Sequence, residues 1–282
     1  MSIQIVNLTH IYSPGTAFEK KALSDINLTI EKGEFVGLIG HTGSGKSTLV
    51  QHLNVLLRPH EGKILIDSED INADKSRLKA IRSKVGLVFQ YPEHQLFEMT
   101  VFKDVAFGPN NAGLDADEVR RRAERALAVV GIPPEIHEKS PFELSGGQKR
   151  RVAIAGILAM EPEVLVLDEP TAGLDPRGRN EILGQIQEMR EKLNLTVILV
   201  SHSMEDIARL VDRIFVINHG KIVLSGLPGE IFDKWEILES IGLSTTQSAY
   251  VAQRLRDKGF DIPRGVYTVD GMICAALKIL KR

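Results

Sequence analysis

The amino-acid sequence predicts an α/β protein whose core is a mostly parallel β-sheet covered by helices. Short apolar runs alternate with longer helical patterns over the first 225 residues, which is typical of strand–helix units in a parallel sheet. Two of these runs, 34–39 and 164–167, are apolar almost throughout, as in strands that are buried on both faces. The 282 residues are enough for one large domain with a small appendage.

The order of elements follows from the same patterns. We expect strands at 3–8, 23–30, 34–39, 62–66, 85–89, 164–167, 196–200 and 213–217. We expect helices at 46–56, 116–130, 149–159, 180–193 and 203–210. Because residues 91–160 are almost entirely helical in pattern, we interpret them as a helical subdomain inserted into a domain of residues 1–225. Residues 226–282 are predicted to be an appended unit with helices at 248–258 and 268–280.

Composition excludes several classes of protein. Hydrophobic residues make up 43% and charged residues 26%, which is usual for a folded globular chain, and the net charge of -2 provides no general attraction for nucleic acid. A single cysteine, Cys274, excludes an internal disulfide and a cysteine-rich zinc site. No run approaches the ~18 apolar residues of a membrane span, and residues 1–9 lack the features of a secretory signal. We therefore expect any membrane role to depend on a partner.

A phosphate-binding loop is predicted between the third strand and the first helix. The residues that match G-x-x-x-x-G-K-S are Gly40, His41, Thr42, Gly43, Ser44, Gly45, Lys46 and Ser47. Glycines allow backbone N–H groups to surround phosphate oxygens, and the helix N-terminus adds a partial positive charge. Lys46 is expected at the outer phosphates, the Ser47 hydroxyl at Mg²⁺ and Thr48 at an inner phosphate. The pattern alone leaves open a glycine-rich turn without a ligand.

Two adjacent carboxylates, Asp168 and Glu169, end the apolar run 164–167. Because ligands of parallel α/β sheets bind at the carboxyl ends of strands, Asp168 is placed to hold Mg²⁺ and Glu169 to orient or deprotonate water. The alternative is that one of them caps the following helix.

Three further features narrow the predicted class of phosphate-binding protein. Leu144 and the residues Ser145, Gly146, Gly147 and Gln148 precede a helix, and their hydroxyl and open N–H groups would make a second anion site. Gln90 follows the strand at 85–89, and His202 follows the strand at 196–200. Taken singly, such a histidine is more often structural and such a glutamine is usually solvated.

In chain order, the phosphate loop, Gln90, the LSGGQ run, Asp168–Glu169, residues 172–175 and His202 resemble the ATPase subunits of ABC transporters over residues 1–225. This resemblance implies a P-loop NTPase fold with a mostly parallel sheet core, an antiparallel β subdomain, an inserted helical subdomain and a small C-terminal α/β appendage. It also implies that two subunits dimerise head to tail, so that Ser145, Gly146 and Gly147 of one cover the ATP bound at residues 40–48 of the other.

The resemblance also assigns roles to single residues. Tyr12 would stack on adenine; the alternative is an edge aromatic in a turn. Asp175 would lie at the dimer contact, and His202 would touch the γ-phosphate. Gln90 would connect magnesium and water to the transport partner.

A narrower resemblance rests on residues 89–97 (FQYPEHQLF), residues 12–16 and the C-terminal tail. These are similar to the ATPase subunits of energy-coupling factor (ECF) transporters, above all to the second, A-prime subunit. It implies a peripheral protein on the cytoplasmic face of the cell membrane that energises import of vitamins or transition-metal ions. It implies three partners: a non-identical second ATPase subunit, a transmembrane coupling subunit and a membrane substrate-binding subunit. The tail would contribute to dimerisation. Glu93 would meet an arginine of the coupling subunit or would simply complement a helix dipole.

Other classes of ATPase fit the sequence less well. Two basic runs, 120–122 and 149–151, have acidic neighbours and no interleaved aromatics, so we interpret both as solvated helix faces rather than nucleic-acid sites. A chromosome-clamp ATPase needs a long heptad run, which the sequence lacks. A ribosome-acting ABC protein usually carries two cassettes, and a non-hydrolysing module would not need both Glu169 and His202.

Overall fold

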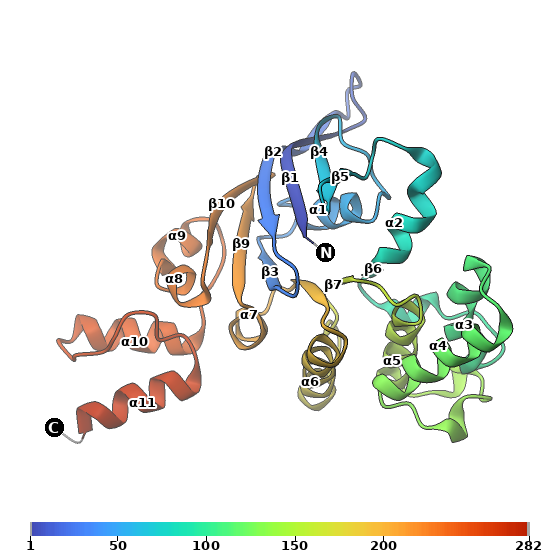
Figure 1. Cartoon of the computed structure of the whole chain (residues 1–282). Helices are drawn as coiled ribbons and strands as arrows, with labels where there is room; N and C mark the ends of the chain where they lie inside the picture. Colours follow the sequence, from blue (N-terminus) through green and yellow to red (C-terminus); the bar gives the residue numbers. More distant parts are fainter. Residues whose placement is uncertain (1, 281–282) are drawn as a thin grey trace.

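The computed structural model describes residues 2–280, which form two β-sheets (Figure 1). The first is a four-stranded antiparallel sheet with the order β2 (Lys20–Ile30), β1 (Ile3–Tyr12), β4 (Glu61–Ile66) and β5 (Glu69–Asp70). The second has six strands in the order β10 (Lys221–Gly226), β9 (Arg213–Asn218), β3 (Phe35–Ile39), β8 (Thr196–Val200), β7 (Val164–Asp168) and β6 (Val85–Val88). Its pairs are parallel except β10–β9, which confirms the predicted core.

Four strands of the six-stranded sheet are buried on both faces. Every residue of β3, β6, β7 and β8 is buried, which explains why these strands are apolar without alternation. Successive residues of β7 enter two different cores: Val164 and Val166 pack in the core that includes β1 and α1 (Lys46–Leu53), while Leu165 and Leu167 pack in the core that includes α6 (Pro176–Leu193) and α7 (Met204–Leu210). Between β5 and β6 lie η1 (Lys75–Arg77) and α2 (Leu78–Lys84).

A helical region follows β6 and lies beside that edge of the sheet (Figure 1). It comprises η2 (Pro92–Gln95), α3 (Val101–Ala112), α4 (Ala116–Val129), η3 (Pro134–Ile136), η4 (Pro141–Glu143) and α5 (Gly146–Leu158). The side chains of Thr100, Asp115 and Ser145 cap α3, α4 and α5 by accepting a backbone N–H in the first turn.

The C-terminal tail is helical, not α/β as the resemblance implied. Within residues 227–280, all of them described, α8 (Pro228–Phe232), α9 (Trp235–Ser240), α10 (Gln247–Asp257) and α11 (Val269–Leu280) occur without a strand. The expected helices at 248–258 and 268–280 are thus confirmed as α10 and α11. The apolar residues Val269, Ile273 and Leu277 recur every four positions, which is a helical period.

Among residues 2–280, none of the helices combines the length and apolar character required to cross a lipid bilayer.

Candidate functional site

Four strand ends meet at one edge of the six-stranded sheet. The strands β3, β8, β7 and β6 are parallel neighbours, so their carboxyl ends lie together. The phosphate loop leaves β3, His202 follows β8, Glu169 follows β7 and Gln90 follows β6. The topology therefore brings together side chains that lie up to 162 positions apart in the sequence (from Gly40 to His202).

The loop of residues 40–47 needs its glycines for two different reasons. Gly43 and Gly45 have φ values of 79° and 115°, which L side chains rarely adopt. A Cβ on Gly40 would instead overlap the carbonyl oxygen of Ile217 and the Ser44 hydroxyl. The Ser44 hydroxyl is buried and has no hydrogen-bond partner in the described structure, so it is available to a phosphate oxygen.

The side chain of Lys46 closes the same loop. It is 6% exposed, and its Nζ donates to the carbonyls of Gly40 (2.7 Å) and His41 (3.0 Å). The His41 ring itself is turned toward Asn218 at the end of β9, with 3.0 Å between Nε2 and Oδ1. His41 and Thr42 can therefore offer a phosphate their backbone N–H groups.

Burial shifts the pKa of the two ionisable groups nearest the loop toward the neutral form. Burial lowers the pKa of Lys46, although the carboxylates of Glu169 and Asp168 act to raise it. Burial also raises the pKa of Asp168, against a hydrogen bond from Ser47 that favours the charged form. The Ser47–Asp168 contact places a hydroxyl and a carboxylate oxygen side by side, and both are hard ligands of the kind that Mg²⁺ prefers.

Glu169 is the point at which the other strand ends converge. Nε2 of Gln90 donates to its Oε2 at 3.1 Å, and Nε2 of His202 lies 2.7 Å from its Oε1. Its φ of 52° is unusual for a residue other than glycine. Helix capping does not explain these carboxylates, because Asp168 is the last residue of β7 and α6 is capped by Asp175, which accepts from Gly178 N at 2.7 Å.

Tyr12 ends β1 beside the phosphate loop. Its hydroxyl lies 3.2 Å from Oγ1 of Thr48, and its ring meets that of His10 edge to face at 4.6 Å. With 37% of its surface exposed, the tyrosine can present a ring face to a base.

The residues of the LSGGQ run lie elsewhere in the chain's fold, at the start of α5. Ser145 and Gln148 form a reciprocal cap: Gln148 N donates to Ser145 Oγ (3.3 Å), and Ser145 N donates to Gln148 Oε1 (3.0 Å). Nothing lies within 4 Å of a Cβ built on Gly146 or Gly147, so the backbone there is open. The helix α5 packs against α3, α4, η2 and η4 in the helical region, and Figure 1 shows it well apart from α1. The structure thus separates this motif from the phosphate loop of the same chain.

Comparison with known proteins decides the family. The model of the family described as ABC transporter matches residues 23–172. The chain belongs to the ABC transporter ATPase family. It is 56% identical to the ECF transporter ATP-binding protein EcfA2 of Clostridium tetani, over 99% of this chain and 97% of the relative. The protein of the same name in Caldanaerobacter subterraneus subsp. tengcongensis is 58% identical over 96% and 94%.

Solved structures agree with this assignment. The structure of cbiO1 from Clostridium perfringens, part of the ABC transporter complex cbiONQ, matches with a TM-score of 0.76 and 40% identity over 91% of this chain and 96% of that one. The ATP-binding cassette MJ0796, dimeric in a post-hydrolysis state with ADP and Pi, matches with a TM-score of 0.71 and 31% identity over 80% and 98%. This chain is accordingly an ATPase of the ECF group, as the motifs predicted.

One arginine of this ABC ATPase was missed by sequence reasoning. The sequence pattern places Arg150 in a solvated run, but its side chain is 1% exposed and forms a two-pronged ion pair with Glu93, at 3.0 and 2.7 Å. Burial acts to raise the pKa of Glu93, yet the hydrogen bonds from Arg150 prevail and leave that pKa below its usual value. A signal existed in the sequence: Arg150 precedes Ile154 and Leu158 at four-residue spacing on the buried face of α5.

The other basic run behaves as predicted. Arg120 pairs with Glu124, while Arg121 and Arg122 pair with Glu118 and Glu161 on or next to α4.

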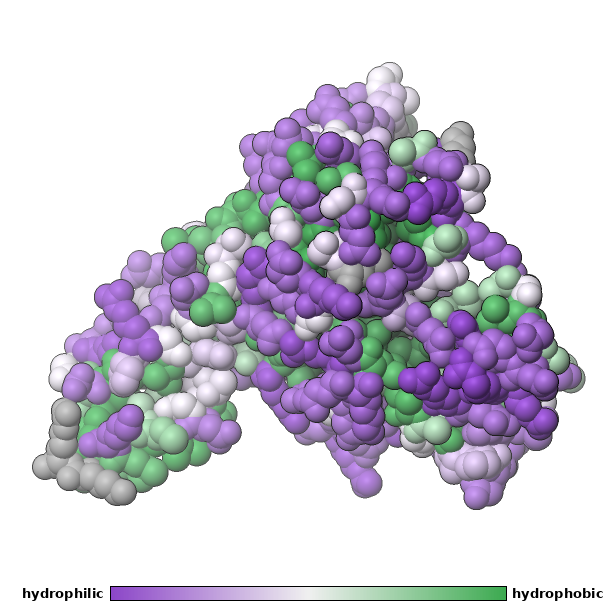
Figure 2. All heavy atoms as spheres, viewed as in Figure 1, coloured by the Kyte–Doolittle hydropathy of each residue, from purple (hydrophilic) through white to green (hydrophobic). Residues whose placement is uncertain are grey.

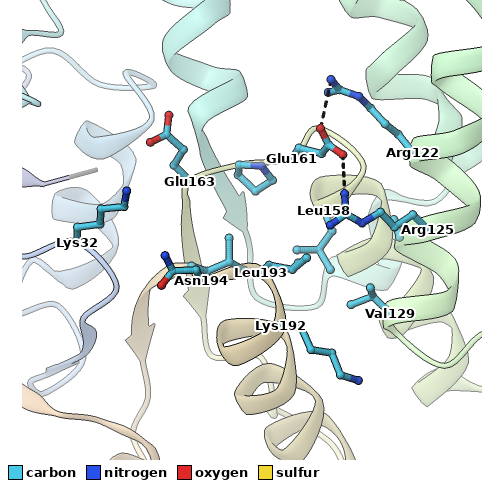
Figure 3. A pocket seen from close by; sticks show the side chains of 13 residues that line it. Lys32, Arg122, Arg125, Val129, Leu158, Glu161, Glu163, Lys192, Leu193 and Asn194 are labelled. Atoms are coloured by element: carbon cyan, nitrogen blue, oxygen red, sulfur yellow. Dashed lines mark hydrogen bonds and ion pairs between the residues drawn. The ribbon is translucent and has the colours of Figure 1, made fainter.

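A pocket of about 420 Å³ lies at the opposite end of β7 from Glu169 (Figure 3). Glu163, Pro162 and Asn194 border it where β7 and β8 begin, and Figure 3 shows Glu161 holding Arg122 and Arg125 on its far side. This pocket is therefore separate from the candidate nucleotide site.

Proposed function

We propose that this chain is the ATP-hydrolysing subunit that energises an ECF-class importer, and that it works as half of an ATP-sandwich dimer. The observation that carries the proposal is the position of Glu169, which receives Gln90 and His202 from two neighbouring strand ends at the edge where the phosphate loop begins. A carboxylate held in this way can orient or deprotonate a water molecule next to a bound nucleotide.

The residues divide the chemistry as follows. Lys46 and the N–H groups of residues 40–48 hold the negative charge that develops on the γ-phosphate. His202 contacts that phosphate, and Tyr12 stacks on adenine. Ser47 and Asp168 would hold Mg²⁺, which neutralises phosphate charge, and Gln90 would lie at the same ion. Most of the rate acceleration comes from positioning and electrostatics, because phosphoryl transfer needs little covalent chemistry from the protein.

The second half of the site comes from a companion subunit. Ser145, Gly146 and Gly147 form an open helix start on α5, which lies well apart from α1 (Figure 1), and a companion's nucleotide would satisfy its N–H groups. The cassette MJ0796, which shares this fold, is dimeric. Asp175, which is exposed at the start of α6, would lie at the contact between the two subunits.

Membrane partners are proposed from the surface around Gln90. Large apolar side chains are exposed on the segment that follows it and on α3; they are Tyr91, Phe97, Met99 and Phe107. We propose that they receive a transmembrane coupling subunit at the cytoplasmic face of the membrane. A membrane substrate-binding subunit would select the cargo, a vitamin or a transition-metal ion.

The tail is proposed as a dimerisation unit of residues 226–282 that meets a non-identical second ATPase. On α11, the side chains of Val269, Ile273, Leu277 and Leu280 are 48–81% exposed. Figure 2 shows hydrophobic residues on the surface at this end of the molecule. An exposed apolar stripe of this kind is costly in water unless another surface covers it.

The decisive test compares two identical substitutions at opposite ends of β7. Glu169→Gln should retain ATP binding while turnover falls by about two orders of magnitude or more, whereas Glu163→Gln, at the far end of the strand, should leave turnover unchanged. Turnover near the unmodified value in Glu169→Gln would refute the site. Purification from membranes should yield integral membrane subunits; recovery of DNA or ribosomes in their place would refute the transport role.

A further inference from the structure

A buried arginine links the segment after Gln90 to the segment after Glu169. Arg150 on α5 is among the largest fully buried side chains of the described structure. One side of its guanidinium holds Glu93 through Nε and Nη2. The other side, Nη1, donates to the carbonyls of Pro170 and Ala172, each at 2.9 Å. A planar guanidinium suits such a role, because it can donate in several directions from a fixed frame.

The two carbonyls belong to the turn that sets the direction of Glu169. Pro170 is the next residue in the chain, and Glu169 itself has a left-handed backbone with its N–H donated to Val200 O at 2.9 Å. Such a conformation persists only where the surroundings hold it in place. Thr171, between the two carbonyls, is held separately by Asp206 at 3.3 Å. The turn is therefore fixed from α5 and from α7.

Glu93 extends this link to the Gln90 segment. Gln90 and Glu93 lie three residues apart, and both contact the same region: Gln90 touches the Glu169 carboxylate directly, and Glu93 reaches the turn behind it through Arg150. A displacement of the Gln90–Glu93 segment would therefore move the Glu169 carboxylate and the turn behind it together, because the buried Glu93–Arg150 ion pair resists separation.

We propose that Arg150 is a positioning residue for ATP hydrolysis, which sets the orientation of Glu169 through Pro170 and Ala172 and is itself held by Glu93. The inference rests on the proposed role of Glu169. The Glu93–Arg150 pair then connects two parts of the protein mechanically: the segment after Gln90, at the proposed contact with the coupling subunit, and the turn after Glu169. A merely structural arginine would affect folding but not the turnover of the folded protein.

The test uses the full-length protein in the assembly in which it purifies. Arg150→Lys keeps a cation but cannot hold both carbonyls and Glu93 at once, and Glu93→Gln keeps the volume but removes the charge. For each, kcat per folded molecule should fall at least about tenfold, since small misplacements of catalytic groups are costly. KM for ATP and the dissociation constant of a fluorescent ATP analogue should stay within about threefold. Arg151→Lys, on the next position of α5, is the matched control and should match the unmodified protein.

The double variant separates a shared pathway from two unrelated defects. Because both substitutions act through one ion pair, Arg150→Lys with Glu93→Gln should lose no more turnover than the more damaging single variant. If the turnover losses of the two single variants multiply in the double variant, the proposal is overturned. An unchanged kcat in folded Arg150→Lys would also overturn it, and so would a loss of nucleotide affinity as large as the loss of kcat. If Arg150→Lys does not fold, an unchanged kcat in Glu93→Gln overturns the proposal and a reduced one supports it.

Glu169→Gln, measured alongside, distinguishes two kinds of failure. If its turnover collapses while that of Arg150→Lys does not, the role of Arg150 alone is wrong. If Glu169→Gln remains active, the proposed site is wrong and the inference falls with it.

Discussion

Oε1 of Glu169 lies 2.7 Å from Nε2 of His202, although the two residues come from different strand–loop units of the chain. The contact depends on register: Asp168 pairs with Val200 at the ends of β7 and β8, which brings Glu169, one residue beyond β7, and His202, two residues beyond β8, to the same edge of the sheet. Gln90 enters from β6 on the other side of β7. A slip of one residue in either pairing would turn these side chains away from each other.

His202→Ala should therefore impair hydrolysis more than binding. The ring contacts the Glu169 carboxylate and is placed to contact a γ-phosphate, so its loss removes a polar group from the reacting centre. We expect kcat to fall by about 10²-fold, with a small change in nucleotide affinity. Steady-state ATPase assays and equilibrium nucleotide binding measure the two effects, and an unchanged kcat would contradict the assignment of His202.

Lys46→Ala should mainly weaken nucleotide binding. The substitution removes a buried charge that would hydrogen-bond to the outer phosphates, and such charge-assisted bonds correspond to about a 10- to 100-fold change in affinity. Isothermal titration with ATP at fixed salt measures the effect. Lys63→Ala on β4, an exposed lysine away from the phosphate loop, is the control. Equal affinity in Lys46→Ala and Lys63→Ala would show that residues 40–47 do not grip phosphate.

Stability should fall in mild acid because of a histidine cluster behind Tyr12. The rings of His52 and His60 lie 4.8 and 5.0 Å from that of His10. Burial, assisted by neighbouring His10, lowers the pKa of His52 from 6.5 to about 4. Between these values the unfolded chain binds a proton that the native protein does not, so the free energy of unfolding decreases as pH falls from 6.5, by up to about 3 kcal/mol near pH 4.

Urea unfolding of the unmodified protein and of His52→Leu across this range measures the contribution. The variant should lose less stability in acid, while His94→Leu, at an exposed position, should follow the unmodified protein. Parallel pH profiles for all three proteins would exclude His52 as the source.

Leu277→Asp should disrupt the association proposed for the tail. The substitution places a charge in the middle of the exposed stripe of α11, where a second ATPase subunit would cover it. Analytical ultracentrifugation without ATP should show at least about a tenfold weaker dimer. Lys278→Glu, an exposed neighbour outside the stripe, should have little effect. A dissociation constant unchanged by Leu277→Asp would rule out α11 as the contact.

Two features of the fold were not predicted from sequence. The strand β10 has only a short apolar run, 222–224, and its side chains alternate between partly and fully exposed; the turn at His219 and Gly220, both with positive φ, folds it back on β9. The α/β character expected of the tail was wrong because helix packing against the core, not strand pairing, buries Phe232 and Leu238.

By itself, the sequence determined the family, the parallel core and nearly every residue of the proposed site. Phosphate binding needs glycines, a lysine and hydroxyls in one short segment, and buried parallel strands need continuous apolar runs, so both leave local patterns. Only the tertiary structure decided that the partners of Arg150 are Glu93, Pro170 and Ala172. The spacing of Arg150 with Ile154 and Leu158 indicates the buried face of a helix, but it cannot name the partners, because they lie 57 residues before the arginine and 20 to 22 residues after it.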